Sequence, residues 1–361
     1  MRAAVFYGNH DIRIEEAPIP TVGRDELLLE VLVVGVCGTD AAEFDAGPSM
    51  FPIAHRDRQT GHEGPMIPGH EFVGRVEAVG SEVEGFEVDM QVVSSAGVAC
   101  GRCHWCRRGQ TNLCRDYWTV GLERNGALAE YVAVPASVCM DVAPYGLTTD
   151  AAALAQPMSI GVHAVGRGRL EAGDVAVLIG TGAIGTFMAH AAAATGATVV
   201  AVDLDDRRLF QARQLGAAHI VNPDEVSAAQ YLAENALIPT VVYEVTGSTA
   251  GLDAALAVTA RGTRLVLVGH QKHHRTLDLD DLILREVEVI GSNASVFDVD
   301  LPRALSVIAA REAGWADIAP VALPLEDLVA GALEPIARGT SAQVKTLIDP
   351  RSARSRPTRM I

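Results

Sequence analysis

The fold of this chain is decided by residues 175–185, which read VAVLIGTGAIG. Residues 175–179 form a short apolar run typical of a buried strand, and the alanine-rich segment 183–194 predicts a helix. Between them the glycines have the spacing G-x-G-x-x-G, which lets backbone amides approach a pyrophosphate at the start of a helix. An ordinary glycine-rich turn is the alternative. The residues expected to bind a dinucleotide are Gly180, Thr181, Gly182, Ala183, Ile184 and Gly185.

The dinucleotide is expected to be NAD, because the next predicted strand ends at Asp203. A carboxylate in this position accepts hydrogen bonds from a ribose hydroxyl and repels the 2′-phosphate of NADP. Asp205 and Asp206 add negative charge. Arg207 and Arg208 oppose this preference, since either could reach a 2′-phosphate, although the exposed start of a helix also explains them. We count Arg208 among the expected cofactor-binding residues.

The rest of the chain follows two patterns. After the glycine loop, apolar runs alternate with helical stretches such as 250–260, which is the pattern of a doubly wound parallel sheet. Before about residue 150, short apolar runs separated by glycine and proline predict a mostly β domain. The fold class is therefore α/β. The predicted strands are 27–36, 72–79, 90–94 and 128–134 in the first part, 198–202, 240–245, 263–268 and 287–290 in the second, and 344–348 near the end.

The composition excludes several classes of protein. With 361 residues, of which 49% are hydrophobic, the chain is long enough for two cores. Its formal net charge of −16 opposes lasting contact with nucleic acid or an anionic membrane surface. The N-terminus does not read as a signal peptide, and the longest apolar stretches are too short to cross a bilayer. We expect a cytoplasmic protein with neither nucleic acid nor a membrane as its partner.

Four of the six cysteines lie within fifteen residues, at Cys100, Cys103, Cys106 and Cys114. Tight C-x-x-C spacing in a large cytosolic chain favours a bound metal over disulfides. Four thiolates complete a tetrahedral zinc shell and leave no position for water or substrate, so the predicted site is structural. An iron–sulfur cluster is the second interpretation and disulfides are the third.

A second group of potential ligands comes from two separated segments. Residues 37–40 read CGTD and residues 69–71 read GHE, which offer the thiol of Cys37, the imidazole of His70 and the carboxylate of Glu71. Each of these alone has an ordinary explanation in packing or structural hydrogen bonding. Together with the glycine loop they predict an open zinc site whose fourth position takes water or an alcohol.

These motifs, in this order, resemble the zinc-containing medium-chain dehydrogenases, particularly the branch of sorbitol, threonine and butanediol dehydrogenases. The resemblance covers nearly the whole chain. Beside the glycine loop and the four cysteines, it rests on CGTD at 37–40, PGHE at 68–71 and QPMS at 156–159. Residues 47–52 and 344–348 are similar to the (R,R)-butanediol dehydrogenases in particular.

The resemblance implies a domain organisation and an assembly. Residues 1–150, completed by 296–361, would form a GroES-like catalytic domain that is mostly β, and residues 151–295 would form a Rossmann NAD-binding domain. Each chain would hold one catalytic and one structural zinc ion. The family also implies a homodimer or a homotetramer.

The implied reaction transfers a hydride between a small-molecule substrate and NAD. The expected substrate is a secondary alcohol or vicinal diol similar to 2,3-butanediol, with a polyol or sugar such as sorbitol as the alternative. Zinc held by Cys37, His70 and Glu71 would lower the pKa of the alcohol, and the Thr39 hydroxyl would pass its proton onward. Thr39 also has an ordinary explanation, in which its hydroxyl fixes the loop backbone.

The chain departs from this family at two positions. Gln156 stands where the family usually has glutamate; it could coordinate zinc through its oxygen or bind the zinc-bound water, but it brings no negative charge. Ala42 stands where relatives commonly carry the histidine that ends a proton relay. Glu43, His55 or His62 could substitute for that histidine, and for each of them a solvated loop residue is the plainer interpretation.

The remaining motif residues are expected to have structural roles. We expect Asp40 to orient a zinc ligand without binding the metal. His163 and Cys139 are expected to pack in the core. The arginine-rich segment 351–359 is expected to be a loosely held terminus.

Two rival functions use the same fold. A zinc-free quinone or enoyl reductase would need neither Cys37 and His70 nor the four cysteines. A non-catalytic nucleotide-binding protein would have no use for an intact set of Cys37, Thr39, His70 and Glu71, although Gln156 and Ala42 keep this hypothesis open.

Overall fold

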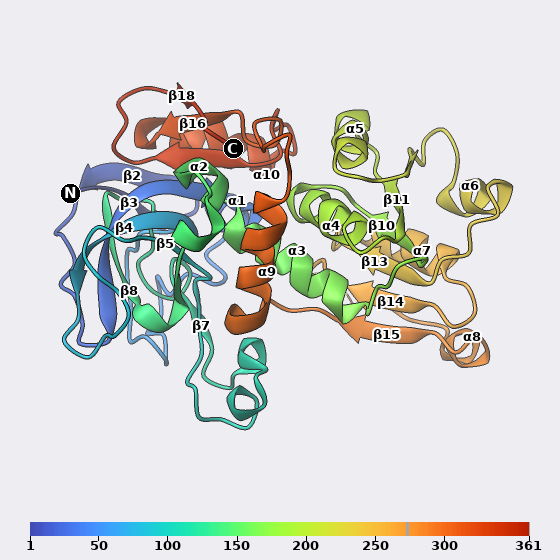
Figure 1. The fold of residues 1–361 in the computed structure, drawn as a ribbon, viewed down its shortest axis with the longest axis horizontal. Helices are drawn as coiled ribbons and strands as arrows, with labels where there is room; N and C mark the ends of the chain where they lie inside the picture. The colour runs from blue at the N-terminus through green and yellow to red at the C-terminus, as the bar shows by residue number, and fades with distance from the viewer. Residues whose placement is uncertain (272–273, 361) are drawn as a thin grey trace. The chain divides into compact units, whose positions relative to one another are not determined.

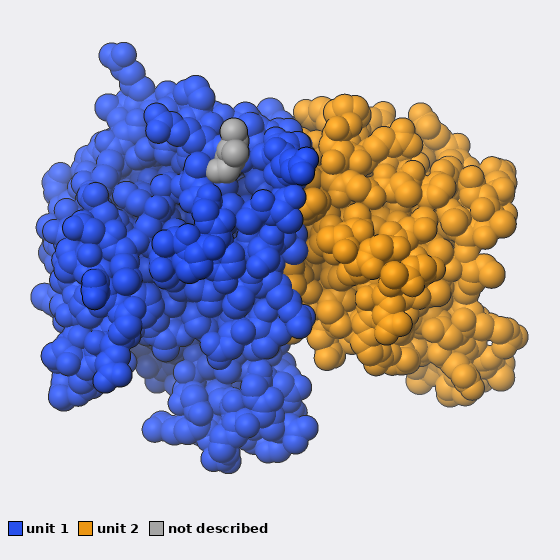
Figure 2. All heavy atoms as spheres, viewed as in Figure 1, with its two compact units in different colours: residues 1–156, 295–361 blue, residues 157–294 orange. Residues whose placement is uncertain are grey.

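The computed structural model describes residues 1–271 and 274–360. The chain divides into two compact units, one made of Met1–Gln156 with Ser295–Ile361 and the other of Pro157–Ala294 (Figure 2). The second unit therefore interrupts the sequence of the first. Among the described residues, no helix combines the length and the apolar character needed to cross a bilayer.

The second unit is built on a six-stranded parallel sheet with the order β12-β11-β10-β13-β14-β15 (Figure 1). Alternate side chains of a strand point to opposite faces. In β10, Ala176 and Leu178 join a core with α4 and α5, whereas Val177 and Ile179 join a core with α6 and α7. Helices cover both faces, which confirms the predicted doubly wound α/β fold.

The elements of this unit lie close to their predicted bounds. The predicted strand 198–202 is β11, and the predicted helix 183–194 ends one residue earlier than expected. In chain order the elements are α3 (Ala155–Arg167, which begins in the first unit), β10 (Val175–Ile179), α4 (Ala183–Ala193), β11 (Thr198–Val202), α5 (Asp206–Gln214), β12 (His219–Val221), α6 (Ala228–Glu234), β13 (Val241–Glu244), α7 (Thr249–Val258), β14 (Arg264–Leu267), α8 (Leu279–Leu284) and β15 (Glu288–Gly291).

The first unit is mostly β. Its strands are β1 (Arg2–Gly8), β2 (Asp11–Glu16), β3 (Glu26–Val36), β4 (Glu71–Val79), β5 (Gln91–Ser94), β6 (Gly97–Val98), β7 (Trp118–Thr119), β8 (Tyr131–Pro135), β9 (Cys139–Asp141), β16 (Val321–Pro324), β17 (Thr346–Asp349) and β18 (Arg356–Pro357). Its α-helices are α1 (Gly38–Ala46), α2 (Thr149–Ala152), α9 (Phe297–Ala309) and α10 (Glu334–Ala337), joined by the short helical turns η1 (Cys106–Arg108), η2 (Thr111–Leu113), η3 (Ala136–Val138), η4 (Ala143–Tyr145), η5 (Leu325–Asp327) and η6 (Val329–Leu333).

Strand β3 is the centre of the larger sheet of this unit. It pairs with β4, β8 and β17, all antiparallel, and most of its side chains are buried. The strand predicted at 128–134 begins only at Tyr131, because the backbone at Leu128 and Ala129 pairs instead with β1. The pairing of β17 with β3 returns the end of the chain to the first unit.

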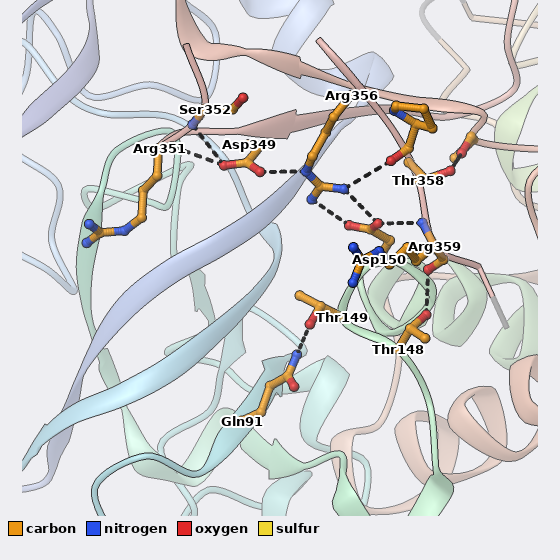
Figure 3. Close-up of polar contacts among 12 residues, drawn as sticks. Gln91, Thr148, Thr149, Asp150, Asp349, Arg351, Ser352, Arg356, Thr358 and Arg359 are labelled. Atoms are coloured by element: carbon orange, nitrogen blue, oxygen red, sulfur yellow. Dashed lines mark hydrogen bonds and ion pairs between the residues drawn. The ribbon is translucent and has the colours of Figure 1, made fainter. Parts of the chain in front are cut away.

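The arginine-rich end of the chain is bound, so the expectation of a loosely held terminus was wrong. The Arg356 guanidinium donates to both oxygens of Asp150, at 2.8 Å each, and to Asp349 at 2.7 Å (Figure 3). The backbone amide of Arg359 donates to Asp150 at 2.7 Å. Asp150 is buried, so its carboxylate needs these partners and holds the tail against α2. A charged segment can look mobile in sequence because its partner lies about 200 residues away.

We expect Arg356→Ala to lower the free energy of unfolding by about 2 kcal/mol, because it removes the guanidinium partner of a buried carboxylate. The measurement is a denaturant titration followed by circular dichroism. Arg354→Ala is the matched control, since the Arg354 side chain is exposed. Equal stability of the two variants would contradict a structural role for the ion pair.

Candidate functional site

Cys37 is presented at the junction of β3 and α1. Its backbone amide donates to the Asp40 side chain at 2.9 Å, which caps the start of α1 and fixes the turn. The Thr39 hydroxyl lies 3.8 Å from the Cys37 sulfur and remains partly exposed. The strand end and the helix cap thus hold the thiol and the hydroxyl side by side.

His70 and Glu71 approach Cys37 from the neighbouring strand. Gly69 precedes them with φ of 100°, and a side chain there would lie 2.8 Å from the Leu128 backbone nitrogen, so this turn requires glycine. Glu71 begins β4 and pairs with Gly35 of β3. One ligand atom from each of Cys37, His70 and Glu71 lies within 4.8 Å of the others. The structure therefore brings the three predicted ligands together.

The electrostatics of this cluster suit a cation. Asp40 Oδ1 and His70 Nδ1 lie 3.5 Å apart, are both buried, and have no hydrogen bond within the described part of the chain. Burial lowers the pKa of His70, but the negative charges of Asp40 and Cys37 outweigh burial and hold that pKa well above its usual range. A buried site that attracts a proton in this way also suits a metal ion. Sulfur, nitrogen and oxygen donors together fit zinc.

Lys345 is a site residue that sequence analysis missed. It is 2% exposed and its Nζ donates to Glu71 Oε2 at 2.6 Å. Burial lowers the pKa of Lys345, but Glu71 and Cys37 raise it, and the balance leaves it above its usual value. The signal was available, because a single lysine at the start of an apolar strand run is unusual. The run itself was predicted as a strand and counted toward the family resemblance, but its lysine was not considered separately.

The chain departs from the family pattern at Gln156 and Ala42, and the structure describes Gln156 and the candidate substitutes for the histidine missing at Ala42. Gln156 is the second residue of α3 and is partly buried, and its contribution to metal binding stays a prediction. Glu43 is buried and accepts hydrogen bonds from the Ser49, Met50 and Phe51 amides, at 2.8, 3.0 and 3.2 Å. It also accepts from the Ser49 hydroxyl. Glu43 therefore anchors the loop after α1, which favours a structural role over a proton relay.

Two other candidates for the relay lie on the following loop. The His62 ring nitrogen lies 3.2 Å from the Gly64 carbonyl oxygen. His55 is exposed. Both observations agree with the plainer interpretation of loop residues.

The four clustered cysteines also lie close together in the structure. Their sulfurs lie within 4.8 Å of one another, and none forms a disulfide. The Cys103 and Cys106 sulfurs are 3.5 Å apart, and the Cys100 amide donates to the Cys114 sulfur at 3.2 Å. Hydrogen bonds from the backbone amides of Cys106 and Arg115 lower the pKa of Cys103 to about 6, which favours its thiolate. The donor set fits a closed tetrahedral zinc site.

The glycine loop has the geometry that its motif predicts. Gly180 has φ of 98°, and a side chain at Gly185 would lie 2.1 Å from the Gly180 carbonyl oxygen, so α4 packs directly on the loop. A side chain at Gly182 would meet no atom within 4 Å. Asp203, at the end of β11, accepts from the Thr181 amide at 2.7 Å and the Thr181 hydroxyl at 3.1 Å. The carboxylate expected to bind ribose thus also ties the loop to the next strand.

The two arginines after Asp203 are already paired. Arg208 lies 3.8 Å from Asp203, and Arg207 lies 2.8 Å from Asp205, which caps α5. These pairs support the interpretation of both arginines as helix-start residues. The Arg208 pair also keeps its guanidinium beside the carboxylate expected to bind ribose.

Glu244 is a second residue that sequence analysis missed. It ends β13, is fully buried, and accepts from the Thr246 amide at 2.8 Å and from Gln271 Nε2 at 2.5 Å. A side chain at Gly180 would lie 2.6 Å from Thr246, so the loop that Glu244 holds contacts the glycine loop. A carboxylate at the end of an apolar strand was the signal that could have found it.

Three comparisons with known proteins agree with this geometry. Residues 23–144 match the alcohol dehydrogenase GroES-like domain, and residues 183–310 match the zinc-binding dehydrogenase family. Sorbitol dehydrogenase of Bacillus subtilis is 34% identical over 81% of each chain. The crystal structure of 2R,3R-butanediol dehydrogenase from Bacillus subtilis has a TM-score of 0.89 and 28% identity, covering 97% of this chain and 99% of that one. A putative zinc-binding dehydrogenase from Sinorhizobium meliloti, solved with NADP, has a TM-score of 0.83 and 26% identity, with 97% and 99% covered.

The glycine loop yields a paired prediction. We expect Gly182→Ala to leave thermal stability unchanged but to weaken nicotinamide dinucleotide binding by about tenfold or more, because its methyl group takes only the space the pyrophosphate needs. We expect Gly185→Ala to lower thermal stability, because its methyl group would overlap the Gly180 carbonyl. Fluorescence titration with NADH and thermal melts check both outcomes. Full dinucleotide affinity in Gly182→Ala would show that this loop does not bind the pyrophosphate.

Proposed function

Since the chain belongs to the zinc-dependent medium-chain alcohol dehydrogenase family, we propose that it oxidises a secondary alcohol or vicinal diol, similar to 2,3-butanediol, to a ketone with NAD. The observation that carries this proposal is the meeting of Cys37, His70 and Glu71 within 4.8 Å of one another. A zinc-free reductase on this fold would not need these donors or the four clustered cysteines. The intact donor set also argues against a protein that only binds nucleotides.

In the proposed mechanism the protein residues hold the metal and move one proton. Cys37, His70 and Glu71 would hold the catalytic zinc, and zinc when bound would polarise the alcohol oxygen and lower the pKa of its hydroxyl. Thr39 would take the alcohol proton through its hydroxyl. Thr39 is partly exposed, and we propose that it passes this proton to water in place of the histidine that is absent at Ala42.

The choice of NAD rests on Asp203. Its side chain is 8% exposed and lies at the end of β11, where the Arg208 guanidinium is 3.8 Å away. A second negative group, the 2′-phosphate of NADP, would meet this carboxylate and the neighbouring Asp205 and Asp206. We propose NAD for this reason, even though one structural relative was solved with NADP.

A polyol is the second candidate substrate. The sorbitol dehydrogenase relative, at 34% identity, favours it. The butanediol dehydrogenase structure, which this chain matches over 97% of its length, favours a vicinal diol. Both substrate classes carry adjacent hydroxyl groups, so the same zinc chemistry serves either one.

We expect the purified protein to form NADH with 2,3-butanediol faster than with sorbitol or simple secondary alcohols, and to form little NADPH. Inductively coupled plasma mass spectrometry should find two zinc ions per chain. Cys37→Ala should lose one zinc per chain and lower kcat/KM by about 1000-fold or more, because the catalytic metal site loses a donor. The matched control is Cys139→Ala, a buried cysteine outside both clusters, which should keep both zincs and most of the activity.

Activity on polyols alone would change the substrate and keep the mechanism. If all alcohols and the corresponding ketones were inactive with both dinucleotides, while two zincs remained bound, the proposed reaction would be wrong.

We further propose that two copies of this chain associate through the β15 edge of the second unit. β15 is the last strand of its sheet, and its outer edge has no partner strand among the described residues. Leu279, Ile283 and Leu284 on α8 are 64, 69 and 72% exposed, and Val289 of β15 is 44% exposed. An unpaired strand edge beside exposed apolar side chains is typical of a surface that another protein chain buries. Two of the nearby acidic residues already pair within the chain, Asp281 with Arg285 and Glu288 with Arg169, which reduces the repulsion that a second copy would meet.

We expect the double substitution Ile283→Asp and Leu284→Asp to convert the protein to monomers, because it places charges on the apolar face. Size-exclusion chromatography with light scattering gives the molecular mass. Ile238→Asp changes an equally exposed isoleucine, 69% exposed, outside α8 and β15, and should keep the assembly intact. A parent protein that is already monomeric would contradict this association.

A further inference from the structure

Glu244 is a fully buried carboxylate that the proposed reaction does not use. Its Oε1 atom accepts from the Thr246 amide at 2.8 Å, from the Thr246 hydroxyl, and from the Gly247 amide at 3.1 Å. Its Oε2 atom accepts from Gln271 Nε2 at 2.5 Å and from the Gly247 amide at 3.2 Å. Because a buried carboxylate needs such donors, Glu244 joins the turn after β13 to the segment after β14.

The turns that follow β10, β13 and β14 are in direct contact. A side chain at Gly180 would lie 2.6 Å from the Thr246 methyl group, and one at Gly269 would lie 2.1 Å from the Gly247 nitrogen. The Glu244 carbonyl oxygen accepts from the Gly269 amide at 3.0 Å. The three turns therefore pack closely, and the Glu244 carboxylate is anchored in the middle one.

The order of the sheet relates these turns to the two halves of a dinucleotide. Strand β10 lies between β11 and β13, and β14 follows β13. A dinucleotide crosses such a sheet at the carboxyl ends of its strands, where the strand order reverses. With the adenosine ribose at Asp203, after β11, and the pyrophosphate at the glycine loop, after β10, the nicotinamide half would lie at the turns after β13 and β14.

We propose that Glu244 is a positioning residue for the nicotinamide half of the cofactor and that it acts by holding Gln271 against the turn after β13. This inference rests on the proposed function, because it assumes a nicotinamide dinucleotide at the glycine loop. The two oxygens of Glu244 have separate partners in Thr246 and Gln271. A change at Gln271 therefore releases the segment after β14 and leaves the contacts of the glycine loop and Asp203 in place.

The test exchanges the two partners of this hydrogen bond. Gln271→Glu sets a second carboxylate against Glu244, and the like charges should separate the two turns. We expect this variant to bind NADH about tenfold more weakly or worse, because a buried hydrogen bond is lost. ADP, which carries only the adenosine half and the pyrophosphate, should bind within about threefold of the parent, because its contacts do not involve Gln271. Fluorescence titration measures NADH binding, and isothermal titration calorimetry measures ADP binding.

Adding Glu244→Gln to Gln271→Glu should restore the contact. The new amide oxygen can still accept from the Thr246 amide, and its nitrogen can donate to the new carboxylate. We expect NADH affinity to return to within about threefold of the parent, because the two changes are coupled. Gln214→Glu is the matched control, since it adds the same charge at an exposed position on α5 and should leave both affinities unchanged.

Three outcomes would overturn the inference. NADH affinity in Gln271→Glu could be unchanged, which would mean that the contact does not position the cofactor. Its NADH and ADP affinities could fall equally, which would indicate general damage to the second unit. The double variant could stay as weak as Gln271→Glu, which would mean that Gln271 does not act through Glu244.

The parent protein separates failure of this inference from failure of the proposed function. If the parent binds NADH and ADP but the variants follow one of those three outcomes, the inference fails and the proposed function stands. If the parent binds neither NADH nor ADP, the proposed function fails and this inference fails with it.

Discussion

The antiparallel pairing of β17 with β3 is the constraint on which the rest of the first unit depends. It joins Thr346 to Val36 across the whole inserted second unit. β3 delivers Cys37 at its end, and β17 delivers Lys345 to the same point. The pairing therefore sets the two residues at the same end of the sheet. The chain therefore builds its candidate metal centre by closing the sheet with its own C-terminal part.

Local patterns predicted the second unit well because its structure is local. An apolar run, a glycine turn and an alanine-rich segment each determine one element, and parallel neighbours follow from right-handed βαβ connections. β11 and α4 accordingly lie at or within one residue of their predicted bounds. The start of β8 was missed because Ala129 pairs with Ala3, a contact across more than 100 residues that periodicity does not encode.

The candidate site was only partly predictable for the same reason. Residue types identified Cys37, His70 and Glu71 as possible ligands, and the family resemblance joined them. The ion pairs Lys345–Glu71 and Arg356–Asp150 each join segments that are far apart in the sequence. The residues that flank Lys345 and Arg356 in the sequence do not indicate which distant carboxylate each one meets. Charged residues near the end of a chain therefore need a structure before they are assigned to solvent.

The charges around the candidate metal centre suggest why Gln156 is compatible with the proposed chemistry. Cys37, Glu71 and Asp40 bring negative groups to the site, and Lys345 offsets one of them through Glu71. A glutamate at position 156 would add a further negative group, whereas glutamine offers a neutral oxygen. With the ammonium and the neutral amide together, a zinc ion held by Cys37, His70 and Glu71 would keep more of its positive charge for the substrate oxygen. Because an ionised alcohol is stabilised by uncompensated positive charge, the substitution at position 156 fits an active centre and gives no reason to infer a lost one.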